Sequence, residues 1–133
     1  MAGLVADTHA ILWYLSDSPR LSSRALARMQ GTVAAGHQIL VPTISLVEIV
    51  YLTEKGRLPD QALGRIYHHL DQPDSGLALA PLDGGVARTV SRISRDQVPD
   101  MPDRLIAATA LYWELPLVTR DRAIQGSGIE TIW

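Results

Sequence analysis

The sequence predicts an α/β fold: a single domain over residues 1–133, with a mostly parallel, five-stranded sheet flanked by helices on both faces. The first observation is that short apolar runs alternate along the chain with longer segments of helical spacing. The second is that strands separated by helices require crossover connections, which join parallel strands. The third is the length of 133 residues, 47% of them hydrophobic, which suits one domain with a single buried core.

The chain begins with a strand and two helices. The apolar run GLVAD at 3–7 is typical of a buried strand, and helical spacing follows at once over 8–16. In LSSRALARM at 21–29 the apolar side chains fall on one stripe and the two arginines on the other. This pattern predicts an amphipathic helix.

The middle of the chain repeats the alternation. QILV at 38–41 predicts the second strand, and Pro42 and Thr43 open a helix that carries Glu48. An amphipathic segment over 60–70 predicts a further helix.

The last part of the chain completes the sheet. LALAPL at 77–82 predicts the third strand, and Asp83 caps a helix that ends near Arg95. The segment 101–115 has the length and spacing of a long helix. The remaining apolar runs are the predicted fourth and fifth strands, PLVT at 116–119 and ETIW at 130–133.

Composition narrows the classes of function. A formal net charge of −2 argues against tight nucleic-acid binding by bulk electrostatics alone, although it leaves room for a local basic rim. The chain has no cysteine, which excludes disulfides, zinc–thiolate sites and thiol nucleophiles. We find no signal-peptide pattern and no apolar run as long as a membrane span. We therefore expect a cytoplasmic protein with no membrane partner.

Four acidic residues lie where the predicted strands end. Asp7 ends the first strand, and Asp121 follows the fourth strand by two residues. Glu48 lies in the first turns of the helix after the second strand, in the otherwise apolar stretch ISLVEIVYL, and Asp103 lies in the first turn of the helix before the fourth strand. Because ligand sites of parallel sheets lie outside the carboxyl ends of the strands, we expect these four carboxylates to converge.

Each of these carboxylates also has a structural explanation. Asp7 and Asp121 stand where helix N-caps are expected, and aspartate is a favoured N-cap residue. Asp100 and Asp103 have the spacing of a capping box. For Glu48 the alternative is a partly buried carboxylate paired with an arginine or with backbone donors from elsewhere in the fold.

A metal ion reconciles four carboxylates in one cleft. Such groups repel one another and raise each other's pKa unless a cation neutralises them. Hard divalent ions such as Mg²⁺ or Mn²⁺ prefer oxygen ligands, and they support attack of water on phosphate esters. The acidic positions therefore indicate metal-dependent phosphodiester hydrolysis.

Histidine and aromatic residues are secondary candidates. His9 is near Asp7 in the chain, but a solvated or capping role is the expected one. The large aromatic side chains lie within apolar helices, so we expect them in the core or at an interface rather than as base-stacking platforms: Trp13, Tyr14, Tyr112 and Trp113.

The chain resembles PIN-domain ribonucleases, in particular the VapC-type toxins of bacterial type II toxin–antitoxin pairs. The resemblance rests on VADTHAILWYL, ISLVEIVYL, VPDMPDRLIAATAL and LPLVTRDRAI, with IETIW at the close. Each motif is weak alone, but together they follow the family order over residues 4–133.

The resemblance implies a fold, an activity and a set of site residues. It implies a PIN-like domain with a central five-stranded parallel sheet, and a Mg²⁺- or Mn²⁺-dependent endoribonuclease that leaves a 5′-phosphate and a 3′-hydroxyl. The acidic quartet of the family falls on Asp7, Glu48, Asp103 and Asp121, which would bind the metal and carry catalysis. Thr119 matches a small hydroxyl position that supports the quartet.

The resemblance also implies partners. These are a homodimer and a cognate VapB-type antitoxin, whose C-terminal segment would cover the active site and form a hetero-oligomer with the toxin. The antitoxin, and not this chain, would bind promoter DNA. Asp100 matches an acidic position that we interpret as a cap or a supporting residue. Arg104, Arg120 and Arg122 are candidates for RNA phosphates, although offsetting nearby carboxylate charge explains them too.

Other functions stay open on the sequence. Within the enzyme class, the alternative is a PIN nuclease of RNA maturation or decay without a toxin role. A receiver-like signalling module also gathers aspartates around Mg²⁺, but it needs a lysine beside the last strand, and the only lysine here is Lys55 in a helix-ending EKGR. A catalytically silent binding module is disfavoured by the intact quartet.

Overall fold

A computed structural model describes all residues from Met1 to Trp133, and its sheet has five strands, each parallel to its neighbours. The strand order is β3-β2-β1-β4-β5, so the chain starts in the middle of the sheet, builds one half and then the other. The strands are β1 (Ala2–Ala6), β2 (Gln38–Pro42), β3 (Leu77–Ala80), β4 (Leu117–Val118) and β5 (Thr131–Ile132).

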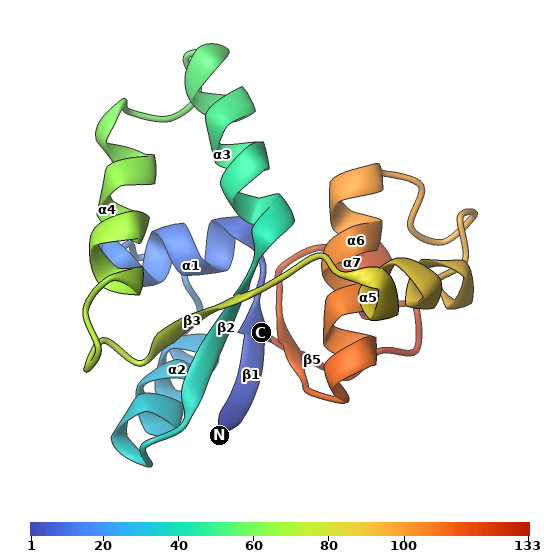
Figure 1. Cartoon of the computed structure of the whole chain (residues 1–133), viewed down its shortest axis with the longest axis horizontal. Helices are drawn as coiled ribbons and strands as arrows, with labels where there is room; N and C mark the ends of the chain where they lie inside the picture. The colour runs from blue at the N-terminus through green and yellow to red at the C-terminus, as the bar shows by residue number, and fades with distance from the viewer.

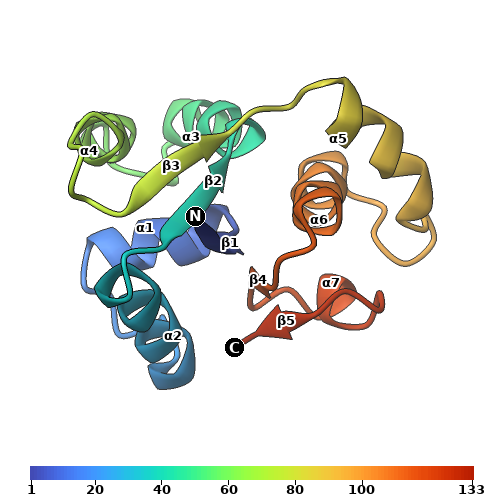
Figure 2. The same cartoon turned by 60° about the horizontal axis from the view of Figure 1, so that its bottom comes forward.

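Helices connect the strands and cover both faces of the sheet (Figure 1, Figure 2). Figure 2 shows α1, α2 and α4 on one side of the sheet and α5, α6 and α7 on the other. No helix combines the length and the apolar character that crossing a membrane demands. The helices are α1 (Thr8–Leu15), α2 (Ser23–Ala34), α3 (Thr43–Glu54), α4 (Gln61–Leu70), α5 (Gly84–Thr89) with the 3₁₀ turn η1 (Val90–Arg92), α6 (Met101–Trp113) and α7 (Arg122–Gln125).

Alternation along the strands creates two hydrophobic cores. In β1, Leu4 and Ala6 point into a cluster with α1, α2, α3 and α4, whereas Val5 points into a cluster with α5, α6 and α7. In β4, Val118 joins the first cluster and Leu117 the second. Both faces of the central strands are therefore buried, as expected of a parallel sheet. The predicted fold class is confirmed.

Several element boundaries differ from the predicted ones. The helix expected over 21–29 begins at Ser23, capped by Ser22, and continues to Ala34. Gly31 does not end it, because Val33 beyond it still packs on the core, and the helix stops before Gly36, which has a φ of +78°. The helix predicted to end near Arg95 ends earlier: α5 and its 3₁₀ turn stop at Arg92, and the chain is extended at the buried Ile93.

The carboxyl ends of the central strands lead straight into helices. A single residue, Asp7, separates β1 from α1, and α3 follows β2 without a break (Figure 1). Short connections of this kind place the first turns of α1 and α3 at the same edge of the sheet. The candidate site lies at this edge.

Candidate active site

Five carboxylates line one cavity of about 340 Å³ at the carboxyl edge of the sheet. The structure thus brings together all four carboxylates that were expected to converge, and it adds a fifth from the residue that caps α6. They are Asp7, Glu48, Asp100, Asp103 and Asp121. They come from four segments of the chain: the end of β1, helix α3, the start of α6 and the end of β4.

Three of these aspartates cap helices as well. Asp7 accepts a hydrogen bond from the N–H of Ala10 at 2.8 Å, and Asp121 accepts one from the N–H of Ile124 at 3.1 Å. Asp100 accepts from the N–H of Asp103 at 3.2 Å. The capping alternative is therefore correct for these residues, and it coexists with their place in the cavity, because each cap occupies only part of a carboxylate's capacity to accept hydrogen bonds.

The hydrogen-bond partner of Glu48 is a hydroxyl group and not an arginine. Its Oε1 lies 2.5 Å from the hydroxyl oxygen of Thr8, which also lies 3.0 Å from the hydroxyl oxygen of Ser45. Thr8 and Ser45 are buried. We had expected an arginine or backbone donors, so this part of the structural alternative was wrong. Ser45 precedes Glu48 by three residues on one helix, so the two side chains share a face. This spacing was the only feature of the sequence that pointed to a hydroxyl near Glu48.

Thr119 is a buried residue that contacts two of the aspartates, Asp7 and Asp121. Its side chain is fully buried, and its hydroxyl oxygen accepts a hydrogen bond from the N–H of Asp121 at 3.0 Å. The same hydroxyl lowers the pKa of Asp7. Thr119 does not line the cavity, so it acts on the neighbouring carboxylates and not on a ligand.

Burial and mutual repulsion raise two of the pKa values. Burial is the main reason that the pKa of Asp7 lies above its ordinary value of 3.8, with a smaller contribution from the charge of Glu48. The pKa of Asp103 rises to about 8, through burial first and then through the charges of Asp121, Asp100 and Glu48. Asp7 and Asp103 therefore keep their protons more readily than ordinary aspartates, and a cation in the cavity would favour their charged forms.

The arginines divide into two groups. Arg120 lines the cavity, and its guanidinium carbon lies 4.8 Å from the centroid of the Trp13 ring. Arg57, which the sequence did not single out, lines it too. Arg104 instead donates its Nε–H to the carbonyl of Ile93 at 3.0 Å, and Arg122 lies on α7; neither belongs to the cavity lining.

The donor set fits a hard divalent cation. Carboxylate and hydroxyl oxygens line the cavity, and oxygen atoms are the ligands that Mg²⁺ and Mn²⁺ prefer. The chain has no cysteine and therefore no thiolate ligand. No three histidine or acidic side chains stand close enough together to hold a metal ion as they are placed, although five carboxylates line the cavity.

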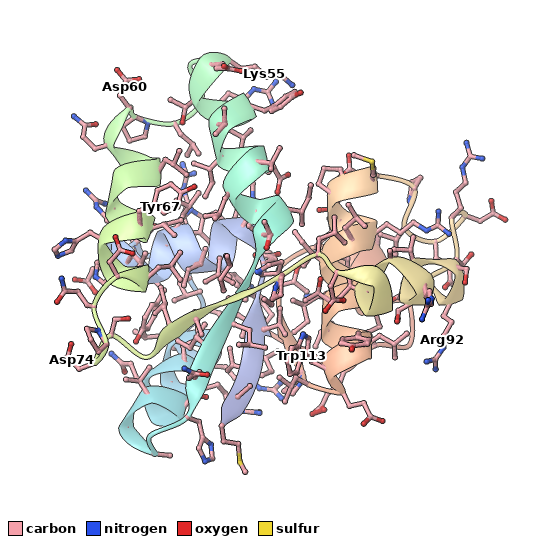
Figure 3. All side chains as sticks on the ribbon, in the orientation of Figure 1. Lys55, Asp60, Tyr67, Asp74, Arg92 and Trp113 are labelled. Atoms are coloured by element: carbon pink, nitrogen blue, oxygen red, sulfur yellow. The ribbon has the colours of Figure 1, made fainter.

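The arrangement lacks the lysine of a receiver module. Lys55 follows the last residue of α3, at the end of that helix remote from the sheet (Figure 3). It does not line the cavity.

Comparisons with known proteins agree with this fold. Ribonuclease VapC22 from Mycobacterium tuberculosis is 27% identical over 125 residues, which cover 94% of this chain and 92% of that protein. DNA-bound VapBC from Salmonella typhimurium matches with a TM-score of 0.71 at 20% identity, over 98% of this chain and 97% of that chain. VapBC2 from Rickettsia felis, bound to a DNA fragment from their promoter, matches with a TM-score of 0.70 at 14% identity, over 96% of both chains.

A family model gives the most direct assignment. The model of the PIN domain matches residues 4–126, a range that contains all five carboxylates of the cavity. The two structural matches have low identity and support the fold alone. The chain therefore belongs to the PIN domain family.

Proposed function

We propose that this protein is a Mg²⁺- or Mn²⁺-dependent endoribonuclease and the toxin of a VapBC-type toxin–antitoxin pair. The observation that carries the proposal is the cavity in which five carboxylates meet with two arginines at its wall. A relative with 27% identity bears the name ribonuclease, which supports the same activity.

We assign the carboxylates of the cavity to the cation and the arginines to RNA. Asp7, Glu48, Asp103 and Asp121 would hold the ion, with Asp100 as a supporting residue. When bound, a divalent ion supplies Lewis-acid chemistry: it favours attack by water and neutralises phosphate charge. Thr8, Ser45 and Thr119 fix the orientation of the carboxylates through hydrogen bonds.

The arginines at the cavity wall would bind the substrate. Arg120 and Arg57 line the cavity, and a guanidinium matches the geometry of a phosphate. Arg104 and Arg122, which the sequence also suggested for this role, lie outside the lining, so we assign the phosphate contacts to Arg120 and Arg57.

A cleavage assay tests the activity. We expect the purified protein to cut a structured RNA in the presence of Mg²⁺ or Mn²⁺, to stop when EDTA is added, and to resume when the ion is restored. Cleavage that persists in EDTA would overturn the metal mechanism. Mapping of cut sites after a short induction in cells would identify the RNA that is cleaved.

A second groove suits the antitoxin. A groove of about 180 Å³ between α1, α4 and the loop before α4 shares His9, Trp13 and Arg57 with the acidic cavity. Its floor is apolar, its rim carries Arg20, Arg57 and Arg65, and no acidic residue lines it. An antitoxin segment with apolar and acidic side chains would complement this groove and continue over the cavity. The solved neighbours include VapBC complexes, which supports such a partner.

Helix α3 offers a surface for a homodimer. Val47, Val50 and Tyr51 are 47%, 36% and 59% exposed and form a stripe on the helix face opposite the buried Ser45 and Ile49. Light scattering tests the dimer. We expect Tyr51→Asp to shift the protein toward the monomer. The corresponding change of the exposed Tyr67 on α4, Tyr67→Asp (Figure 3), serves as the control.

A further inference from the structure

Trp13 lies at the centre of a stack on one wall of the acidic cavity. The guanidinium carbon of Arg120 is 4.8 Å from its ring centroid, and the ring centroids of His9 and Trp133 are 5.5 Å and 6.0 Å away. Only 9% of Trp13 is exposed, whereas Arg120 and His9 are exposed. The indole is thus enclosed, and the cationic group that the stack presents to the cavity is the guanidinium.

The stack keeps Arg120 apart from the carboxylates. An unrestrained arginine beside five carboxylates would pair with one of them, because a guanidinium binds a carboxylate through two parallel hydrogen bonds. The carboxylates of the cavity instead accept hydrogen bonds from Thr8 and from backbone N–H groups, and none accepts from Arg120. The face of an indole is the alternative site for a guanidinium, and Arg120 occupies it.

Trp133 and Arg120 follow two residues that are hydrogen-bonded to each other at the β4–β5 edge of the sheet, and both reach Trp13. The N–H of Thr119 donates to the carbonyl of Ile132 at 3.2 Å, and Arg120 and Trp133 are the residues that follow these two. Both side chains then meet the ring of Trp13 on α1. The position of Arg120 therefore depends on contacts between three segments that are distant in the sequence.

We propose that Trp13 and Trp133 are positioning residues that hold the Arg120 guanidinium at the cavity wall as a two-pronged ligand for an RNA phosphate next to the scissile bond. The inference rests on the proposed ribonuclease function and deepens it. A guanidinium that is already oriented loses less conformational entropy when phosphate binds, so the two tryptophans contribute to RNA affinity without touching RNA.

A binding experiment without turnover tests this inference. The probe is a short fluorescein-labelled single-stranded RNA, titrated with the full chain in Ca²⁺ in place of Mg²⁺ and followed by fluorescence anisotropy at several salt concentrations. Trp133→Ala removes a ring that packs on Trp13, and we expect it to weaken binding by about two- to five-fold, the range of the cation–π contact between Trp13 and Arg120 that it supports. Arg120→Ala should weaken it at least as much and lower the slope of log affinity against log salt by about 0.7, the value for one phosphate contact to a single strand.

A double-mutant cycle separates positioning from a structural effect. Because Trp133 is proposed to act through Arg120, the double variant should bind no more weakly than Arg120→Ala alone. Trp133→Phe, which keeps an aromatic face, should recover most of the affinity. Trp113→Ala, the matched loss of a tryptophan on α6 outside the cavity, should leave affinity unchanged. Thermal unfolding followed by circular dichroism checks that every variant is folded.

The outcomes distinguish this inference from the function on which it rests. Losses from Trp133→Ala and Arg120→Ala that add in the double variant would overturn the positioning role, as would a Trp133→Ala variant that binds like the wild type. Failure of the wild-type protein to bind RNA at all would overturn the proposed ribonuclease function, and this inference with it.

Discussion

The hydroxyl oxygen of Thr8 lies 2.5 Å from Oε1 of Glu48. A hydroxyl carries a single proton, so Thr8 donates to the carboxylate and accepts from Ser45, whose hydroxyl lies 3.0 Å away. Both hydroxyl residues are buried, with Ser45 fully inaccessible. This relay explains how an apolar helix accommodates a carboxylate, and it fixes Glu48 in one orientation at the cavity.

Removal of the Thr8 hydroxyl should weaken metal binding without removing a carboxylate. Thr8→Val keeps the shape of the side chain but leaves Glu48 without its donor. We expect the Mg²⁺ concentration for half-maximal cleavage to rise about ten-fold or more, which is typical when a partner of a metal ligand is lost. We also expect a loss of about 1–3 kcal/mol in the free energy of unfolding, measured with urea. Thr8→Ser should restore both, and an unchanged Mg²⁺ requirement would contradict the relay.

Neutralising single carboxylates should separate catalysis from folding. Asp7→Asn and Asp103→Asn should abolish RNA cleavage and growth arrest. Because asparagine caps helices as well as aspartate does, Asp7→Asn keeps the cap, and we expect the free energy of unfolding to change by less than about 1 kcal/mol through the capping interaction. Asp83→Asn is the matched control: Asp83 caps α5 through the N–H of Val86 at 3.0 Å but does not line the cavity. Full toxicity of either cavity variant would contradict the site.

The raised pKa of Asp103 predicts a pH-dependent stability in the absence of divalent ions. Between its ordinary value of 3.8 and about 8, the folded protein holds a proton on Asp103 that the unfolded chain has released. The free energy of unfolding should therefore fall as the pH rises through this window. The raised pKa of Asp7 acts in the same direction.

Melting temperatures in EDTA across this pH range test the effect. Asp103→Asn cannot ionise, so its melting temperature should decline less with pH than that of the wild type, whereas Asp83→Asn should follow the wild type. Added Mg²⁺ should stabilise the wild type most at the upper end of the window, because the ion binds deprotonated carboxylates. An equal pH dependence in wild type and Asp103→Asn would contradict the assignment of the raised pKa.

Charge reversal in the groove between α1 and α4 should weaken binding of the antitoxin. Arg20→Glu with Arg65→Glu would place acidic groups opposite an acidic segment. We expect affinity for the antitoxin, measured by calorimetry, to fall about ten-fold or more. Arg24→Glu with Arg28→Glu is a matched double reversal on the exposed side of α2, away from the groove, and it should retain affinity. Equal affinity of both double variants would remove the groove from the interface.

The sheet and the meeting of the carboxylates were predictable because they follow from local patterns. Alternating strands and helices imply parallel pairing, and parallel pairing brings Asp7 and Asp121 to one edge whatever the details of packing. The partner of Glu48 was not predictable in this way, because Thr8 reaches it only where α1 crosses α3. Arg57 and Arg104 show the same limit: one enters the cavity through the path of a loop, and the other turns to the carbonyl of Ile93.

The double use of Asp7, Asp100 and Asp121 as helix caps and cavity residues has a genetic consequence. If the protein is the toxin that we propose, a cell that it poisons selects for mutations that inactivate it. Changes of these aspartates to alanine or valine would remove a charge from the cavity and would also loosen the start of a helix. A change to asparagine preserves the cap. Among surviving clones, alleles with asparagine should therefore encode folded, inactive protein that accumulates, whereas alleles with apolar residues should encode protein that is degraded.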